Sequence, residues 1–214
     1  MTFLRARTVE GPGVQGRFFI YNSNGVGNME KRYIIGIDQS TQGTKALLFD
    51  GEGHFLRRTD LPHRQIVNEK GWVSHDLNEI YRNTVQTVKT LVAESGVAPE
   101  EIAGVGIDGQ SWSAIAIDQE GKVLTNTPIW MDTRAQAICD RLNQKVGADK
   151  IFKISGNSLQ PSYSTAKIIW YRENKPEVYE KIYKILQSNS YIAFKLTDAI
   201  TQDVSQGYGL HCFD

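Results

Sequence analysis

The chain has 214 residues, and its 24 basic and 24 acidic side chains give a formal net charge of zero. A chain of this length forms one sizeable domain or two small ones. Its 40% hydrophobic and 22% charged residues are typical of a folded globular protein. Because a neutral chain has no overall attraction to phosphate backbones or anionic lipid, the charge argues against a nucleic-acid binder and a membrane-surface protein.

Cysteine usage indicates the compartment. The two cysteines, Cys139 and Cys212, lie far apart and form no C-x-x-C pair. This pattern favours a reducing, cytoplasmic compartment over a disulfide framework. The histidines show no H-E-x-x-H or comparable metal spacing. No apolar run approaches the ~20 residues that a membrane span needs, so we expect no membrane partner.

The first 28 residues differ from the rest, with arginines interleaved with glycines and no clear period. No apolar core follows the arginines, so a secretory signal fits poorly. Met29 stands directly before a charged pair and a strong strand. We therefore expect Met29 to be the natural start, residues 1–28 to be an upstream or non-native extension, and residues 29–214 to be the folded domain.

Three strands are predicted first, at 33–38, 44–50 and 54–61, separated by glycine-containing turns. A helix follows, with Asp76 as its N-cap and Glu79 at the capping-box spacing. Apolar residues then recur at helical spacing until Gly96 closes the element.

The remaining predicted elements are strands at 102–107, 113–118 and 122–124, helices at 133–146, 164–173 and 190–196, a helix that begins near Pro176, and an extended stretch at 200–203. Hairpin strands followed by a helix and a further strand do not follow the strict alternation of a doubly wound fold. We predict an α/β fold of the ribonuclease H-like type that actin-like ATPases use, with a mixed sheet and flanking helices.

A polar turn between the first two predicted strands contains Asp38, Thr41, Thr44 and Lys45. A carboxylate at a strand end can hold a hydrated Mg²⁺. Turn N–H groups and hydroxyls can donate to phosphate oxygens, and the lysine adds positive charge. A Walker A loop is excluded, because no G-x-x-x-x-G-K-[ST] occurs. An ordinary hairpin turn with polar residues stays open as the alternative.

Another predicted turn presents Gln110, Ser111 and Trp112 after a buried strand. An amide beside an indole suits a polyhydroxylated ligand, although a hairpin turn with a core tryptophan has the same pattern. Asp132 or Thr133 would cap the helix that is predicted next. Asp132 could also accept sugar hydroxyls while Arg134 orients it, and both roles can hold if the helix start faces a cleft.

From about Tyr33 to Asp214 the chain resembles the N-terminal domain of the FGGY carbohydrate kinases. Five motifs in the family's order carry the resemblance: Asp38–Lys45, Gly71–Asp76, Gly106–Gln110, Trp130–Arg134 and Pro161–Trp170. The resemblance implies ATP-dependent phosphorylation of a sugar or polyol hydroxyl, by two actin-like domains of which the N-terminal one binds the sugar.

The resemblance also implies roles for single residues. Asp38 would organise Mg²⁺. The ATP phosphates would be approached by Thr41, Gln42, Gly43, Thr44 and Lys45. The sugar pocket would be lined by Gln110, Ser111, Trp112, Asp132, Arg134, Ser162 and Tyr163.

Several positions depart from the family's pattern. Ser40 stands where the family usually has glycine. Neither the Q-R-E of glycerol kinases nor the Q-M-H of xylulose kinases follows at Gln110. The sequence therefore disfavours a polyol such as glycerol and leans toward a ketose such as xylulose, with the Trp112 indole stacked on the sugar.

Family members continue past this point, to the aspartate that acts as general base and to the second, adenine-binding domain. We therefore expect an N-terminal fragment that is inactive alone, with ATP and Mg²⁺ as cofactors of the whole enzyme and a sugar as its partner. A non-catalytic sugar-binding or interaction domain is the alternative, and a homodimer is left open.

A ribonuclease H-like nuclease is disfavoured, because it needs several carboxylates on two metals and only Asp38 and Asp108 sit at strand ends.

Overall fold

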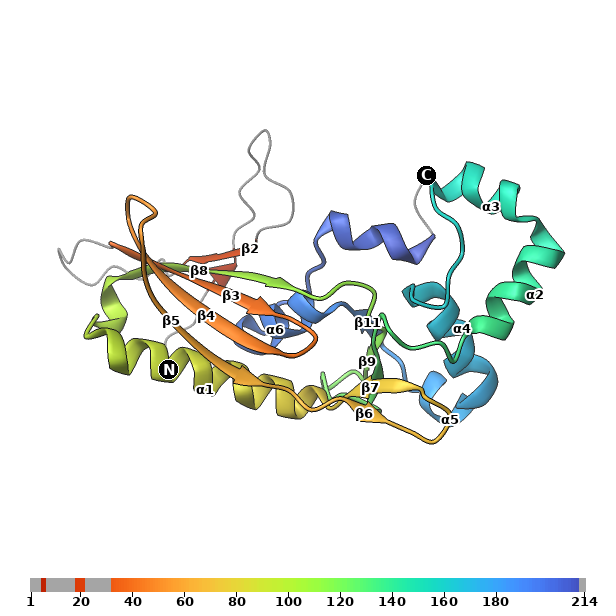
Figure 1. Ribbon diagram of the computed structural model, residues 1–214, viewed down its shortest axis with the longest axis horizontal. Coiled ribbons are helices and arrows are strands. Elements are labelled where there is room, and N and C mark those ends of the chain that lie inside the picture. Colours follow the sequence, from red (N-terminus) through yellow and green to blue (C-terminus); the bar gives the residue numbers. More distant parts are fainter. Residues whose placement is uncertain (1–4, 7–17, 22–31, 212–214) are drawn as a thin grey trace. The chain divides into compact units, whose positions relative to one another are not determined.

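A computed structural model describes residues 5–6, 18–21 and 32–211 of the chain (Figure 1). Met29 and most of the expected extension at residues 1–28 lie outside these ranges. The chain divides into two compact units. The first comprises the segment up to His63, Glu79–Gly109 and Asn189–Thr201, and the second comprises Arg64–Asn78, Gln110–Ser188 and the segment from Gln202 onward.

The first unit contains a six-stranded mixed sheet in the order β1-β2-β8-β3-β4-β5 (Figure 1). Its strands are β1 (Arg5–Ala6), β2 (Phe18–Tyr21), β3 (Tyr33–Gln39), β4 (Gly43–Asp50), β5 (Phe55–Pro62) and β8 (Ile102–Gly109). β3, β4 and β5 pair antiparallel in chain order, and β8 joins β3 in parallel. The three predicted hairpin strands and the strand after the first helix are therefore confirmed, although only Ile107 of β8 is buried.

One face of this sheet is apolar because every second residue of β3 and β4 points the same way. Ile35 and Ile37 on β3 are buried, as are Ala46 and Leu48 on β4. Helix α1 (Leu77–Ser95) runs along the sheet (Figure 1). Its predicted N-cap is confirmed, because Asp76 Oδ1 accepts a hydrogen bond from the N–H of Asn78 at 2.9 Å.

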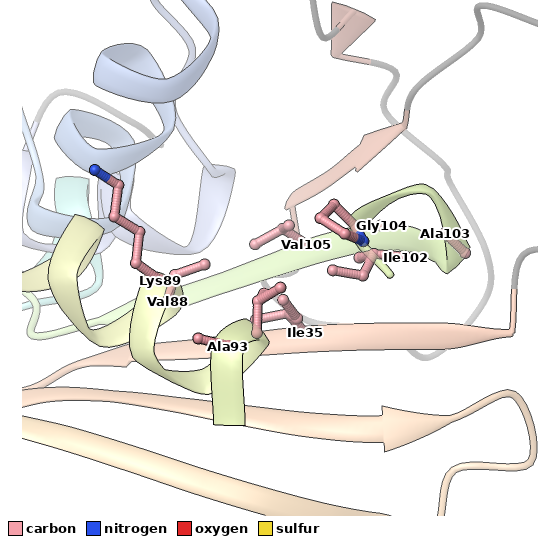
Figure 2. A pocket seen from close by; sticks show the side chains of 10 residues that line it. Ile35, Val88, Lys89, Ala93, Ile102, Ala103, Gly104 and Val105 are labelled. Carbon is pink, nitrogen blue, oxygen red and sulfur yellow. The ribbon is translucent and has the colours of Figure 1, made fainter. Parts of the chain in front are cut away.

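A recess lies between α1 and the strands β3 and β8, and Figure 2 shows the side chains that line it. Ile35, Val88 and Ile102 contribute apolar surface, and Lys89 is the single charged side chain of the lining. A sugar needs several convergent hydrogen-bonding groups. This recess is therefore not the kind of pocket that the sequence predicts.

The second unit is built from short sheets and helices around one core. Its elements are β6 (Ile66–Val67), β7 (Val73–His75), β9 (Ile115–Ile117), β10 (Thr127–Pro128), β11 (Lys184–Leu186), α2 (Gln136–Val146), α3 (Ala148–Ser155), α4 (Ser164–Asn174) and α5 (Pro176–Tyr179). The sheets have the orders β10-β7-β6 and β11-β9. Ile138, Cys139, Trp170 and Tyr171 belong to the buried cluster that joins α2 to α4. Burial raises the pKa of the Cys139 thiol to about 11.

Several boundaries differ from the sequence predictions. Helix α2 begins at Gln136 rather than at Thr133, because Asp132 and Arg134 form a turn of their own before it. The stretch 200–203 is not a strand, and a 3₁₀ helix, Val204–Leu210, follows it. Helices α4 and α5 occur where they were predicted, as does α6 (Ser188–Thr197). Within the described ranges, the helices are too short or too polar to cross a membrane.

Gly43→Ala tests how tightly β4 and β5 approach each other. A Cβ at Gly43 would lie 2.6 Å from the carbonyl oxygen of Leu61, so the hairpin would have to open. We expect a loss of about 1–3 kcal/mol in the free energy of unfolding, measured by urea denaturation. Gly36→Ala is the matched control, because its Cβ would meet only the Phe49 ring at an ordinary 3.7 Å. Equal effects of the two variants would contradict the steric argument.

Candidate functional site

In the first unit, the β3–β4 register places Asp38 directly opposite Lys45. The Lys45 Nζ lies 2.7 Å from Asp38 Oδ2, and both side chains are partly exposed. The parallel neighbour β8 places Asp108 beside Asp38. Because paired residues point to the same face of a sheet, two carboxylates and an ammonium group gather at one sheet end.

Asp38 and Asp108 both line a recess on the sheet face that faces away from α1. Its other lining residues include Gly36, Gly106 and Phe49, and the end of β4 with the turn that follows it adds the acidic residues Asp50 and Glu52. Mg²⁺ typically binds through one or two carboxylates and keeps several waters. The described residues hold no cluster of three or more potential metal ligands. The pair therefore fits a hydrated Mg²⁺ and not a fully protein-ligated metal.

The turn between β3 and β4 is closed by Ser40. Its N–H donates to the Gly43 carbonyl at 3.0 Å, and its hydroxyl donates to the same oxygen at 2.8 Å. Serine at this position thus adds a bond that glycine cannot make. Gln42 is exposed at the turn and Thr41 is partly exposed, on the same connection as the Asp38–Lys45 pair.

Thr44 is buried, and a hydrogen-bond chain fixes its hydroxyl. Thr84 donates to the Ile80 carbonyl, so its oxygen accepts from Thr44 at 3.2 Å. The Thr44 oxygen then accepts from His63 Nε2 at 3.0 Å, and His63 Nδ1 accepts from Asn83 Nδ2 at 3.3 Å. The Thr44 hydroxyl is therefore bonded inside the core, and a bond from it to a phosphate oxygen would have to replace one of these contacts.

In the second unit, Asp132 is fully buried and four hydrogen bonds occupy its carboxylate. Oδ1 accepts from the backbone N–H and the Nε–H of Arg134, at 3.0 and 2.7 Å. Oδ2 accepts from the N–H of Val73 at 2.7 Å and from Arg134 Nη2 at 3.0 Å. A carboxylate has about four acceptor positions. Asp132 therefore does not cap α2, whose N-cap position is Ala135, which corrects that expectation. Its predicted contact with a sugar hydroxyl would have to replace one of these four bonds.

Arg134 is the partner that holds Asp132. Its guanidinium packs against two indoles, 5.2 Å from the ring centre of Trp72 and 4.9 Å from that of Trp170, and the two indoles meet edge-on at 5.5 Å. It also donates to the Ser74 hydroxyl at 2.7 Å. Only 9% of the Arg134 side chain is exposed, so it belongs to the wall of this unit rather than to an open binding surface.

Gln110 is oriented by a residue that the sequence did not single out. Its Nε2 lies 3.0 Å from His75 Nδ1. An amide nitrogen can only donate, so His75 Nδ1 accepts and the imidazole carries its proton on Nε2. His75 is almost fully buried, so its ring is held firmly. The signal in the sequence was weak, because a lone histidine in a short strand has no distinguishing spacing.

Trp112 has a backbone conformation that side chains rarely adopt, with φ of 63°. Its indole meets Tyr163 edge-on at 4.8 Å between ring centres and stacks on Tyr208 at 6.3 Å. A Cβ on Gly209 would lie 2.5 Å from the indole, so the ring is closely enclosed on that side. Burial, and then the Tyr208 hydroxyl, raise the pKa of Tyr163 to about 12, which keeps its phenol protonated at neutral pH.

Lys167 on α4 is completely buried. Its Nζ donates to the carbonyl of Trp112 at 2.8 Å and to that of Ser162 at 2.5 Å. Burial lowers the pKa of Lys167 to about 7; the charge of Asp132 acts against that shift and Arg134 adds to it. Lys167 thus connects the two loops that contain Gln110–Trp112 and Ser162–Tyr163.

Comparison with known proteins shows which family the chain resembles. The model for the N-terminal domain of the FGGY family of carbohydrate kinases matches residues 33–214. Glycerol kinase 1 of Thermotoga maritima is 35% identical over 150 residues, which cover 70% of this chain and 30% of that protein. The ligand-bound xylulose kinase of Lactobacillus acidophilus has a TM-score of 0.78 at 25% identity, over 84% of this chain and 36% of that one. Plasmodium falciparum glycerol kinase, solved with ADP, has a TM-score of 0.67 at 30% identity, over 79% and 35% of the two chains.

The strand order β5-β4-β3-β8, with the last strand parallel to β3, and these structural neighbours confirm the predicted actin-like, ribonuclease H-like fold class. The chain belongs to the FGGY family of carbohydrate kinases. It spans about 30% of the length of the curated glycerol kinases that it matches. Proteins named glycerol kinase and xylulose kinase are both among the relatives.

The buried Lys167 predicts a pH dependence of stability. The folded-state pKa of about 7 lies below the ordinary lysine pKa of 10.5, so the unfolded chain binds an extra proton at pH values between the two. The cost of burying this lysine is therefore full below pH 7 and falls as the pH rises. We expect wild type to gain roughly 2 kcal/mol relative to Lys167→Met between pH 7 and 9, in urea unfolding. A flat difference over this range would contradict the lowered pKa.

Proposed function

We propose that this chain is the sugar-binding part of an ATP-dependent kinase that phosphorylates a sugar hydroxyl. The observation that carries the proposal is the second unit's loop pair, in which Trp112 and Tyr163 pack together and Gln110, two residues before Trp112, is held by His75. These loops supply an amide, an indole and a protonated phenol. Such a combination orients a polyhydroxylated ligand and covers its apolar face. Membership of a carbohydrate kinase family supports this function.

We assign phosphate binding to the β3–β4 turn of the first unit. Lys45 supplies positive charge, and Thr41, Gln42 and Gly43 supply groups at the turn that suit phosphate oxygens. Asp38 and Asp108 would hold hydrated Mg²⁺, which when bound neutralises charge on the phosphates of ATP. Thr44 is left out of this assignment, because its hydroxyl donates inside the core.

We assign sugar contact to Gln110, Ser111, Trp112, Ser162 and Tyr163 in the second unit. Asp132 and Arg134 serve in this proposal as the wall behind the site. Phosphoryl transfer depends mainly on positioning and charge neutralisation, so a rigid sugar site is a direct contribution to rate.

We favour a ketopentose such as xylulose as the substrate. The residues after Gln110 are Ser111 and Trp112, so these two positions lack a charged side chain that could hydrogen-bond the hydroxyls of a short polyol. The indole offers a broad apolar surface, which suits a longer sugar better than glycerol. In this proposal the sugar would stack on the face of Trp112 opposite to Tyr208.

Trp112→Ala tests the sugar site. We expect the 214-residue chain to bind D-xylulose more tightly than glycerol in isothermal calorimetry. In the variant we expect the Kd for xylulose to rise at least about tenfold, because a stacking surface is lost. Phe152→Ala, at an exposed position on α3 of the same unit, is the control. An unchanged xylulose Kd in Trp112→Ala would reject the stacking role.

Lys45→Met tests the phosphate assignment. We expect the Kd for MgATP to rise about tenfold, because one cation facing the phosphates is removed. Lys89→Met is the matched control, since Lys89 lines the apolar recess of the same unit. Equal affinities in the two variants would reject the assignment.

A coupled assay on the same samples reports ATP turnover, and xylulose-dependent turnover by this chain would show that it carries its own general base.

A further inference from the structure

Helix α4 supplies hydrogen bonds to three successive carbonyls of the segment that enters β9. Lys167 Nζ donates to the Trp112 carbonyl at 2.8 Å, and Ser164 Oγ donates to the Ser113 carbonyl at 3.2 Å. Tyr171 Oη donates to the Ala114 carbonyl at 3.1 Å. This segment has no strand partner of its own, so one face of α4 satisfies its backbone instead.

Lys167 differs from the other two donors because it also binds a second loop. The same Nζ donates to the carbonyl of Ser162, in the turn before α4. The lysine therefore joins two loops that both contain proposed sugar contacts. A completely buried amine is costly to retain, and apolar side chains of similar volume fill a core at lower cost. Its presence here indicates a role that packing alone does not supply.

The conformation of Trp112 indicates what that role is. A tryptophan with φ of 63° is strained, and such conformations persist only where the surroundings hold them. Tyr163 and Tyr208 hold the ring, and Lys167 holds the carbonyl. If Lys167 no longer bonds the Trp112 carbonyl, the backbone at Trp112 can leave its strained conformation, because the contacts of the indole alone do not fix the carbonyl.

We propose that Lys167 is a positioning residue that clamps the Trp112 loop to the Ser162 loop and so fixes the geometry of the sugar site. This inference rests on the proposed function for its connection to sugar. The clamp needs N–H donors and not the charge itself, because a neutral amine still offers two donors for the two carbonyls.

Hydrogen–deuterium exchange on the full chain tests the clamp without any sugar. In Lys167→Met we expect backbone exchange to become at least tenfold faster in peptides covering 110–113 and 161–164, with α1 unchanged. Tyr171→Phe is the matched control: it removes one buried donor from the same helix to the neighbouring Ala114 carbonyl, but nothing that joins the two loops. Lys167→Arg keeps N–H donors and should restore part of the protection.

Calorimetry with D-xylulose then tests the effect on the site. We expect Lys167→Met to raise the Kd at least tenfold and Tyr171→Phe to change it less than twofold. Equal loop exchange in Lys167→Met, Lys167→Arg and Tyr171→Phe would overturn the clamp. Faster loop exchange with an unchanged xylulose Kd would overturn its role in the sugar site. Failure of wild type to bind xylulose or glycerol would instead reject the proposed function, and the exchange comparison would still decide the clamp.

Discussion

The second unit depends on one buried ion pair. The Arg134 guanidinium donates to both carboxylate oxygens of Asp132 and packs against the indoles of Trp72 and Trp170. These residues come from the chain before β7, the turn before α2, and the middle of α4, so a single guanidinium joins three distant segments. A buried pair costs desolvation unless its hydrogen-bonding groups are satisfied. Here the carboxylate is saturated, and the position of α4, which carries Lys167, follows from the same contact.

The first unit depends on strand register. Alternation along β3 and β4 sends Ile35 and Leu48 to the face that α1 covers and leaves Asp38 and Lys45 on the opposite face. The parallel pairing of β8 then brings Asp108 beside Asp38. A shift of one residue would exchange the two faces, so the apolar core and the charged cluster are fixed by the same register.

Much of the fold could be predicted from local patterns. The β3–β5 hairpins, α1 with its Asp76 cap, and α4 were predicted because period and turn chemistry act within a few residues. Helix α3 and strand β11 were not predicted, since a short element is stabilised mainly by what it packs against. The start of α2 was placed too early because Asp132 has a distant partner, the N–H of Val73, that no local pattern reveals.

Residue type and order were enough to predict the family motifs, the fold class and a set of candidate site residues. The hydrogen-bond partners of each polar side chain became known only from the folded arrangement of the segments. Asp132 and Thr44 looked like ligand contacts, but their hydrogen-bonding capacity is used inside the protein. His75 and Lys167 looked ordinary, yet they hold Gln110 and Trp112. A side chain's role depends on which partners surround it, and those partners come from segments far away in the sequence.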